Sequence, residues 1–214
     1  MAIALDTSTS SSDNSGSATS LTWSHTCTGT NLILIVTVST TPQTDKVSGV
    51  TYNGVAMTRV GYAGNSGSQS VASYMYYLLN PATGAHNIVV SVPSNSTNIT
   101  GDAISYTGVL QSGQPDSYAV NNTSTGTTLD LTTTVVATGC WLISTYWNAN
   151  VRTKPSGTTD RGTNGMTVDS NGTVSSGSRT HQWTTDTNNS AQAGVIASIS
   201  PVPDNFNALP IFFT

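Results

Sequence analysis

Apolar and hydroxyl-bearing side chains alternate along much of this chain with a period of two residues. The segment from 20 to 26 (SLTWSHT) places Leu21, Trp23 and His25 on one face and hydroxyl groups on the other. Successive side chains of an extended strand point to opposite faces, so this pattern predicts a strand with one buried face. The pattern returns between turn-forming residues along the chain, and we therefore expect an all-β protein.

The amino-acid composition also favours strands. Charged residues make up only 7% of the 214 residues, and all ten acidic residues are Asp, whereas about a quarter of an average soluble domain is charged. Helix surfaces depend on Glu, Lys, Arg and Ala, while the Thr, Ser, Asn and Gly that dominate this chain favour strands, turns and loops. A helical bundle is therefore excluded.

Two segments give the clearest local predictions. Asn31–Ser39 is a nearly continuous apolar run rich in β-branched residues, which predicts a central strand covered on both faces. Val50–Val60 carries Asn53 and Gly54 between two β segments, which indicates a hairpin with a two-residue type I′ turn. Further strands are expected over 71–79, 87–92, 101–106, 117–120, 129–136, 139–147, 166–168, 179–184 and 193–200.

About a dozen strands joined mostly by short turns predict a two-sheet antiparallel β-sandwich of jelly-roll type. We expect this single domain to cover residues 20–200, after a polar N-terminal arm over residues 1–19. Segment 148–164 is the one long irregular stretch and holds three of the six basic residues. Loops of this length are often functional, although a mobile surface loop is the plainer interpretation.

An apolar C-terminal tail is expected over residues 201–214. Its four large apolar side chains would be costly to leave in water, so we expect them to dock on a neighbouring subunit. The alternative is that the tail completes the sheet of its own chain as an edge strand. The side chains predicted to dock are Leu209, Ile211, Phe212 and Phe213.

Several partner classes are excluded by charge and hydropathy. The formal net charge is -4, and the six basic residues are scattered, so no basic face for nucleic acid is expected. The longest apolar run, Leu32–Val36, is far shorter than a membrane span, so a soluble protein is expected. The N-terminus lacks the basic region of a signal peptide, so we expect neither a signal nor an anchor.

The sequence contains no recognisable catalytic or metal-binding motif. A G-x-S-x-G elbow is absent, and without Glu the carboxylate pair of a glycosidase would have to be two Asp. His25, His86 and His181 are isolated and lack zinc-ligand spacing. We expect no catalytic residue, no metal and no cofactor.

Aromatic and cysteine side chains leave alternatives open. Sugar-binding sandwiches stack aromatic rings on pyranoses, and Trp147 and Trp183 are the candidates for such stacking, although most aromatic rings should be core. Cys27 and Cys140 are far apart in sequence. They suit a disulfide and a pair of buried thiols equally well.

Five segments carry a resemblance to a known family. They are NLILIVTVS from Asn31, VTYNGVAMTRVG from Val50, YYLLNPATGAHNIVVSV from Tyr76, ISYTGV from Ile104 and AGVIASISPV from Ala193. Together they resemble a jelly-roll or concanavalin-like β-sandwich family of environmental phage virion proteins and bacterial surface modules. The similarity runs roughly from residue 21 to 202 and carries no catalytic motif. Members that stand alone look like virion structural proteins, and those with export signals look like adhesive or sugar-binding modules.

The resemblance and the composition together predict a non-enzymatic phage virion structural protein. We expect a capsid decoration or cement protein on the particle exterior, assembled in the host cytoplasm. Its partners would be the major capsid protein or another virion protein, and it would form a homo-oligomer, with a trimer favoured. The alternative functions are a receptor- or carbohydrate-binding module of a tail fibre or surface adhesin, and a polysaccharide-degrading enzyme.

Overall fold

A computed structural model describes residues 1–65, 70–96, 98–148, 150–188 and 190–203. These residues form antiparallel sheets, and no helix among them is long and apolar enough to cross a membrane. The strands of the first half are β1 (Ala4–Asp13), β2 (Ala18–Cys27), β3 (Ile33–Thr41), β4 (Gly49–Tyr52), β5 (Val55–Ala56), β6 (Thr58–Asn65), β7 (Val71–Leu79), β8 (Gly84–Ser96) and β9 (Asn98–Thr107). Those of the second half are β10 (Ser117–Thr123), β11 (Thr128–Val135), β12 (Trp141–Trp147), β13 (Arg152–Thr153), β14 (Thr159–Asp160), β15 (Thr167–Asp169), β16 (Gly177–Thr185) and β17 (Gln192–Ile199).

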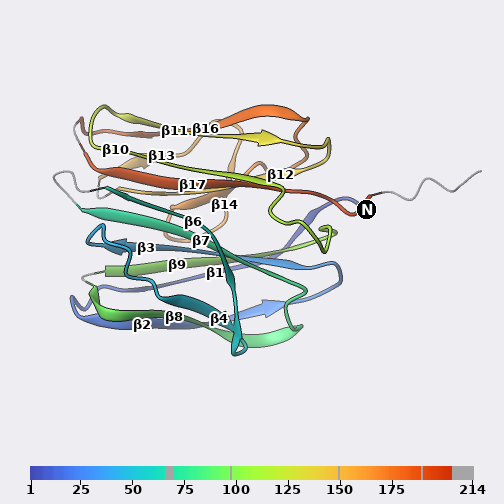
Figure 1. Cartoon of the computed structure of the whole chain (residues 1–214), viewed down its shortest axis with the longest axis horizontal. Coiled ribbons are helices and arrows are strands. Elements are labelled where there is room, and N and C mark those ends of the chain that lie inside the picture. Colours follow the sequence, from blue (N-terminus) through green and yellow to red (C-terminus); the bar gives the residue numbers. More distant parts are fainter. Residues whose placement is uncertain (66–69, 97, 149, 189, 204–214) are drawn as a thin grey trace, which may run out of the picture.

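Four sheets stack face to face (Figure 1). In the order of the stack they are the outer N-terminal sheet (β2-β8-β4-β5), the inner N-terminal sheet (β1-β9-β3-β7-β6), the inner C-terminal sheet (β10-β17-β12-β15-β14) and the outer C-terminal sheet (β11-β16-β13). The expected all-β antiparallel sandwich is confirmed. Each half of the chain forms a two-sheet sandwich, and the two sandwiches pack through their inner sheets.

The two halves share one topology. Strands β10, β17, β12, β15 and β14 occupy in the inner C-terminal sheet the places that β1, β9, β3, β7 and β6 occupy in the inner N-terminal sheet. Strands β11, β16 and β13 likewise correspond to β2, β8 and β4. The chain therefore contains an internal structural repeat, which the sequence pattern alone did not reveal.

Contacts between the repeats are reciprocal. Asp102 on β9 pairs with Thr37 on β3, and Val195 on β17 pairs with Thr145 on β12. Because Thr37 and Thr145 hold corresponding places in their strands, Asp102 and Val195 also occupy corresponding places in the two repeats. Gly61 lies two residues after Arg59 of β6, and Gly162 lies two residues after Asp160 of β14. A Cβ at Gly61 would lie 3.3 Å from the Val195 side chain, and a Cβ at Gly162 would overlap the Asp102 carboxyl. In each repeat a glycine at the same place therefore leaves room for the corresponding side chain of the other repeat. Such reciprocal contacts are those expected of two repeats related by a pseudo-twofold axis.

Three apolar layers fill the spaces between the four sheets. Strand β3 lies in the middle of the inner N-terminal sheet, and all its side chains from Ile33 to Thr40 are buried. Leu34 faces the outer N-terminal sheet, whereas Ile35 belongs to the central layer with Ile143 of the other repeat. The prediction of a central strand covered on both faces is confirmed.

The expected polar N-terminal arm is instead mostly strand. Residues 4–13 form β1, which pairs with β9 from Ala4–Thr107 to Asp13–Ile99. Its hydroxyls are hydrogen-bond partners for buried polar groups: Thr9 contacts His25, and Ser10 donates to Asp102. A polar strand is accommodated at this edge because it satisfies polar atoms inside the sandwich.

The two cysteines are free thiols and both are buried. Cys27 belongs to the apolar layer of the N-terminal sandwich, and Cys140 belongs to that of the C-terminal sandwich. Of the two alternatives left open by the sequence, the structure has the pair of buried thiols.

The hairpin at Asn53-Gly54 has the expected turn. Tyr52 pairs with Val55, and the two residues between them have positive φ, 49° at Asn53 and 77° at Gly54. Both central residues of a type I′ turn require positive φ. This local prediction is confirmed.

Gly54→Val is expected to destabilise the protein by about 1–3 kcal/mol, because a β-branched side chain resists a positive φ. No atom lies within 4 Å of the Cβ position at Gly54, so the loss reports backbone strain alone. Urea titration measures the effect, and Gly54→Asn is the matched control, since Asn tolerates this conformation. Equal losses for the two variants would contradict the turn assignment.

Candidate functional site

A Ser, a His and an Asp meet inside the N-terminal sandwich. Trp23 Nε1 donates to Thr9 Oγ1 at 3.1 Å, and Thr9 Oγ1 lies 2.8 Å from His25 Nδ1. His25 Nε2 lies 3.1 Å from Ser105 Oγ, which itself donates to Asp6 Oδ2 at 2.7 Å. Because the single Ser105 proton goes to Asp6, His25 must donate from Nε2 and accept from Thr9 at Nδ1.

This order of partners does not suit nucleophilic catalysis. In a hydrolase triad the histidine takes the proton of the serine, and the carboxylate orients the histidine. Here the carboxylate binds the serine, and His25 and Ser105 are 1% and 0% exposed. Burial lowers the pKa of His25 to about 4, so the ring stays neutral and ties β2 to β1 and β9.

A second Ser–His pair lies inside the C-terminal sandwich. Ser144 Oγ is 2.8 Å from His181 Nδ1 and accepts the Trp183 Nε1–H at 3.2 Å. Ser144 is fully buried, and burial lowers the pKa of His181 to about 4. This pair is also part of the hydrogen-bonded framework.

Trp183 does not offer a sugar-stacking surface. Its side chain is fully buried, and its ring stacks on Tyr146 with 5.0 Å between centroids and 7° between planes. Side chains of β16 alternate between the two faces of the strand, and Trp183 lies on the face that packs in the layer between the two C-terminal sheets. The role expected for Trp183 from the sequence is therefore corrected to core packing.

The central layer contains a buried ion pair that links the repeats. Asp169 Oδ2 accepts from Arg161 Nε at 2.6 Å and from the Tyr106 hydroxyl at 2.8 Å, and Oδ1 accepts from the Asn171 amide at 2.9 Å. Asp169 is fully buried, and the Arg161 side chain is 10% exposed. Tyr106 comes from β9, so the cluster joins the two inner sheets.

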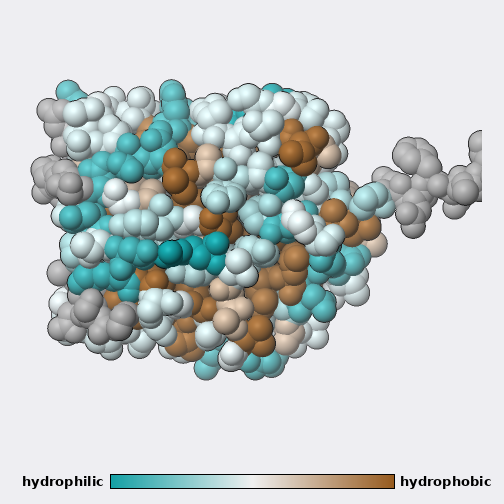
Figure 2. Space-filling view, in the orientation of Figure 1, coloured by the Kyte–Doolittle hydropathy of each residue, from teal (hydrophilic) through white to brown (hydrophobic). Residues whose placement is uncertain are grey.

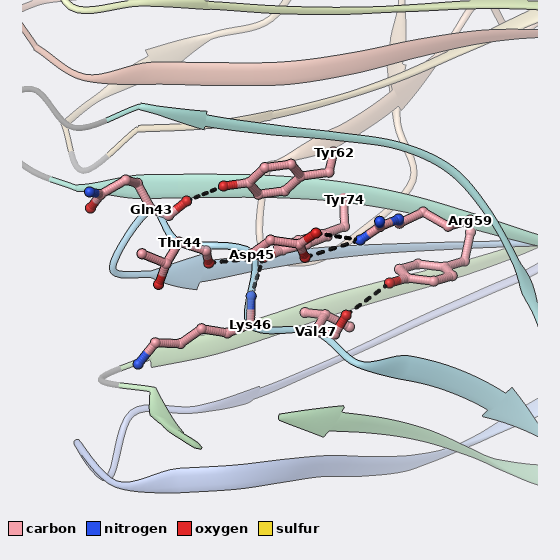
Figure 3. Close-up of polar contacts among 9 residues, drawn as sticks. Gln43, Thr44, Asp45, Lys46, Val47, Arg59, Tyr62 and Tyr74 are labelled. Carbon is pink, nitrogen blue, oxygen red and sulfur yellow. Dashed lines mark hydrogen bonds and ion pairs between the residues drawn. The ribbon is translucent and has the colours of Figure 1, made fainter. Parts of the chain in front are cut away.

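One open cleft, here called the N-terminal cleft, lies between β4–β5 and β6 and measures about 640 Å³. One wall is segment 43–47, held by three tyrosine hydroxyls (Figure 3). The wall is tied to β6 by Arg59, whose Nη1 donates to both carboxylate oxygens of Asp45, at 3.0 and 2.8 Å. The tyrosines and their acceptors are Tyr62 to the Gln43 carbonyl, Tyr74 to the Thr44 carbonyl and Tyr76 to the Val47 carbonyl.

A related opening, the C-terminal cleft of about 520 Å³, lies at the equivalent strands β13 and β14 of the second repeat. An ion pair also borders it, with Lys154 Nζ 2.7 Å from Asp160 Oδ2. Asp160 pairs with Val168 as Arg59 pairs with Tyr76, so the charge at this place is reversed between repeats. Both pairs are 40–45% exposed and contribute little stability.

The junction cleft, of about 440 Å³, is built from both repeats. Ser12, Asn14, Asn98 and Thr100 come from the first repeat, and Trp147, Arg152 and Asn164 come from the second. The Arg152 guanidinium carbon lies 4.5 Å from the centroid of the Trp147 ring. The Trp147 ring, a candidate for stacking on a sugar, is therefore covered on one side by the Arg152 guanidinium.

Sequence reasoning missed Arg152 as a site residue. The available signal was the concentration of basic residues in segment 148–164: Arg152 and Lys154 line the C-terminal cleft, and Arg152 also lines the junction cleft. The four tail residues predicted to dock, Leu209, Ile211, Phe212 and Phe213, lie outside the described residues. Within the described part of the chain, no three His, Cys or Asp side chains are grouped to hold a metal ion.

Comparisons of the chain with protein-family models, with curated proteins and with solved structures gave no match. The geometry of the chain itself therefore carries the functional argument.

Proposed function

We propose that this chain is a non-enzymatic structural protein of the exterior of a phage particle, in the role of a capsid decoration or cement protein. The observation that carries the proposal is that the serine and histidine side chains that could serve in catalysis have structural roles instead. Both Ser–His pairs among the described residues are buried and serve as hydrogen-bonded ties between strands. A four-layer scaffold with few charges keeps its surface properties over a wide range of salt.

The described surface offers exposed apolar side chains for assembly. Figure 2 shows hydrophobic and hydrophilic residues interleaved over one face of the molecule. Strand β10, at the edge of the inner C-terminal sheet, exposes Tyr118 and Val120. Edge strands with exposed apolar side chains favour pairing with another chain. The proposed partners are the major capsid protein and further copies of this chain, in a trimer.

The experiment that tests this function is a quantitative mass-spectrometric count of the protein in purified particles. A decoration protein is expected in a fixed ratio to the major capsid protein and should be released without loss of the capsid shell. Absence from particles, or turnover of polysaccharides by the pure protein, would overturn the proposal.

Removing the tail tests the assembly role separately. Deleting residues 209–214 is expected to leave the melting temperature unchanged while abolishing binding to particles that lack the protein. The physical reason is that a docked apolar tail contributes about 25 cal/mol per Å² buried to association. Co-sedimentation with such particles measures the loss. Unfolding or precipitation of the truncated monomer would assign the tail to the chain's own core.

A further inference from the structure

Arg152 is a half-buried cation that no carboxylate neutralises by contact among the described residues. Its Nη1 donates to the Asn148 carbonyl at 3.2 Å, and its Nη2 donates to the Asn164 carbonyl at 3.0 Å. Its guanidinium carbon lies over the Trp147 ring, 4.5 Å from the ring centroid. The guanidinium is thus fixed in position by neutral groups only, while burial lowers its pKa. A fixed guanidinium of this kind suits a planar anion such as a carboxylate.

A buried acid, Asp102, contacts a lining residue of the junction cleft but does not itself line the cleft. Asp102 Oδ1 accepts from Ser10 Oγ at 2.6 Å and from Asn164 Nδ2 at 3.2 Å. Burial raises the pKa of Asp102, and its carboxylate attracts the Arg152 guanidinium through space, but no hydrogen bond joins the two side chains among the described contacts. Asp102 therefore orients Asn164, and Arg152 is the charged side chain among the residues that line the junction cleft.

The remaining lining of the junction cleft is uncharged and rich in amides and hydroxyls. Asn14, Asn98 and Asn164 contribute amide groups, which both donate and accept hydrogen bonds. Sugar hydroxyls have the same double capacity. The Trp147 Nε1 atom is buried and has no hydrogen-bond partner among the described residues, so it is not counted among the groups offered to a ligand.

We propose that the junction cleft binds an acidic saccharide, with Arg152 holding a sugar carboxylate and the asparagine amides holding the hydroxyls around it. Arg152 also lines the adjoining C-terminal cleft, so a chain of several sugars has room on both sides of the guanidinium. Trp147 positions the guanidinium and does not stack on the sugar. The proposal goes beyond the structural function, because it adds a ligand to a protein whose assembly role does not require one.

The test measures binding of polygalacturonate oligomers by isothermal titration calorimetry, with fully methyl-esterified oligomers as the neutral probe. Wild-type protein is expected to bind the acid form and not the ester, with affinity that falls as salt rises. Arg152→Gln should weaken binding about tenfold or more, because it removes a charge-assisted hydrogen-bond donor. Arg152→Lys should recover only part of the loss, since it restores the charge without the planar fork.

A second variant leaves the packing of Arg152 untouched. Asn14 is exposed at the rim, and Asn14→Asp adds a repulsive charge there, so binding should weaken several-fold. The matched controls are Asn87→Asp on the outer N-terminal sheet and Arg179→Gln on β16, which should bind like wild type. The melting temperature of each variant checks its folding.

Three outcomes would overturn the proposal. The first is equal binding of the acid and the ester, and the second is unchanged binding by both Arg152→Gln and Asn14→Asp. The third is binding of inorganic phosphate as strong as that of the oligomer, which would indicate a simple anion site. None of these outcomes bears on the particle ratio that tests the structural function, so the two proposals fail independently.

Discussion

Acidification from pH 7 to pH 4 is expected to destabilise this protein by up to about 3 kcal/mol for each of two buried histidines. The pKa values of His25 and His181 are lowered to about 4 by burial, from the ordinary value of 6.5. Between these two pH values the unfolded chain binds more protons than the folded one. The stability that each neutral histidine contributes is therefore fully present above about pH 6.5 and is lost as the pH falls to about 4.

The neighbours of the two histidines modify this effect without reversing it. Asp6 acts on His25 and Asp169 acts on His181, and each carboxylate raises the pKa against the larger effect of burial. Asp102 acts in the opposite direction on stability, because burial raises its pKa and the folded state then favours the protonated form in acid. The net loss should therefore be smaller than the sum for two histidines.

Urea titrations at half-unit steps from pH 7 to pH 4 measure this loss. The double variant His25→Gln, His181→Gln should be less stable at pH 7 but should show a much flatter pH dependence. His86→Gln is the matched control, because His86 lies on the outer sheet, where its ring contacts the Thr83 carbonyl and the edge of Tyr52. The pH dependence of this variant should equal that of the wild type. A double variant with the slope of the wild type would refute the assignment to the two histidines.

Asp169→Ala is expected to cost about 3–5 kcal/mol, because it leaves a nearly buried guanidinium without its carboxylate. Asp169 accepts three hydrogen bonds, and its loss strands Arg161 and the Tyr106 hydroxyl in the layer between the repeats. The matched control is Asp160→Ala, which breaks the exposed pair with Lys154 and should cost about 1 kcal/mol or less.

Chemical unfolding of both variants checks this difference. Replacing both partners, as in Asp169→Leu with Arg161→Met, should recover much of the loss, since no uncompensated charge then remains buried. Equal losses for Asp169→Ala and Asp160→Ala would show that the buried pair carries no special weight in joining the repeats.

Part of the candidate site was within reach of the sequence. Segment 148–164 stood out by its length and basic residues, and it does border two clefts. The roles of Trp147 and Trp183 were not predictable, because strand alternation says which side chains share a face but not what covers that face. Trp183 meets Tyr146 in the core, and Trp147 meets Arg152, which is five residues further along the chain.

The sequence by itself determined the elements whose causes are local. The turn at Asn53-Gly54 follows from two residues that tolerate positive φ, and β3 follows from an unbroken apolar run. The all-β class follows from period-two alternation in a chain poor in helix-favouring residues.

Only the tertiary structure decided how these strands are shared among four sheets and that β1 belongs to one of them. The sequence of β1 looks like that of a polar arm because the partners of its hydroxyl groups are distant in sequence. Thr9 contacts His25, 16 residues away, and Ser10 contacts Asp102, 92 residues away. The repeat could not be recognised in the sequence for the same reason. Corresponding places in the two repeats hold different residue types, Arg59 and Asp160 in one case and Asp102 and Val195 in another, because each residue suits its own contacts in the folded protein. The period of the sequence determines which side chains of one strand share a face. Whether that face is buried, and which strand pairs with it, depends on the sheet that packs against the strand.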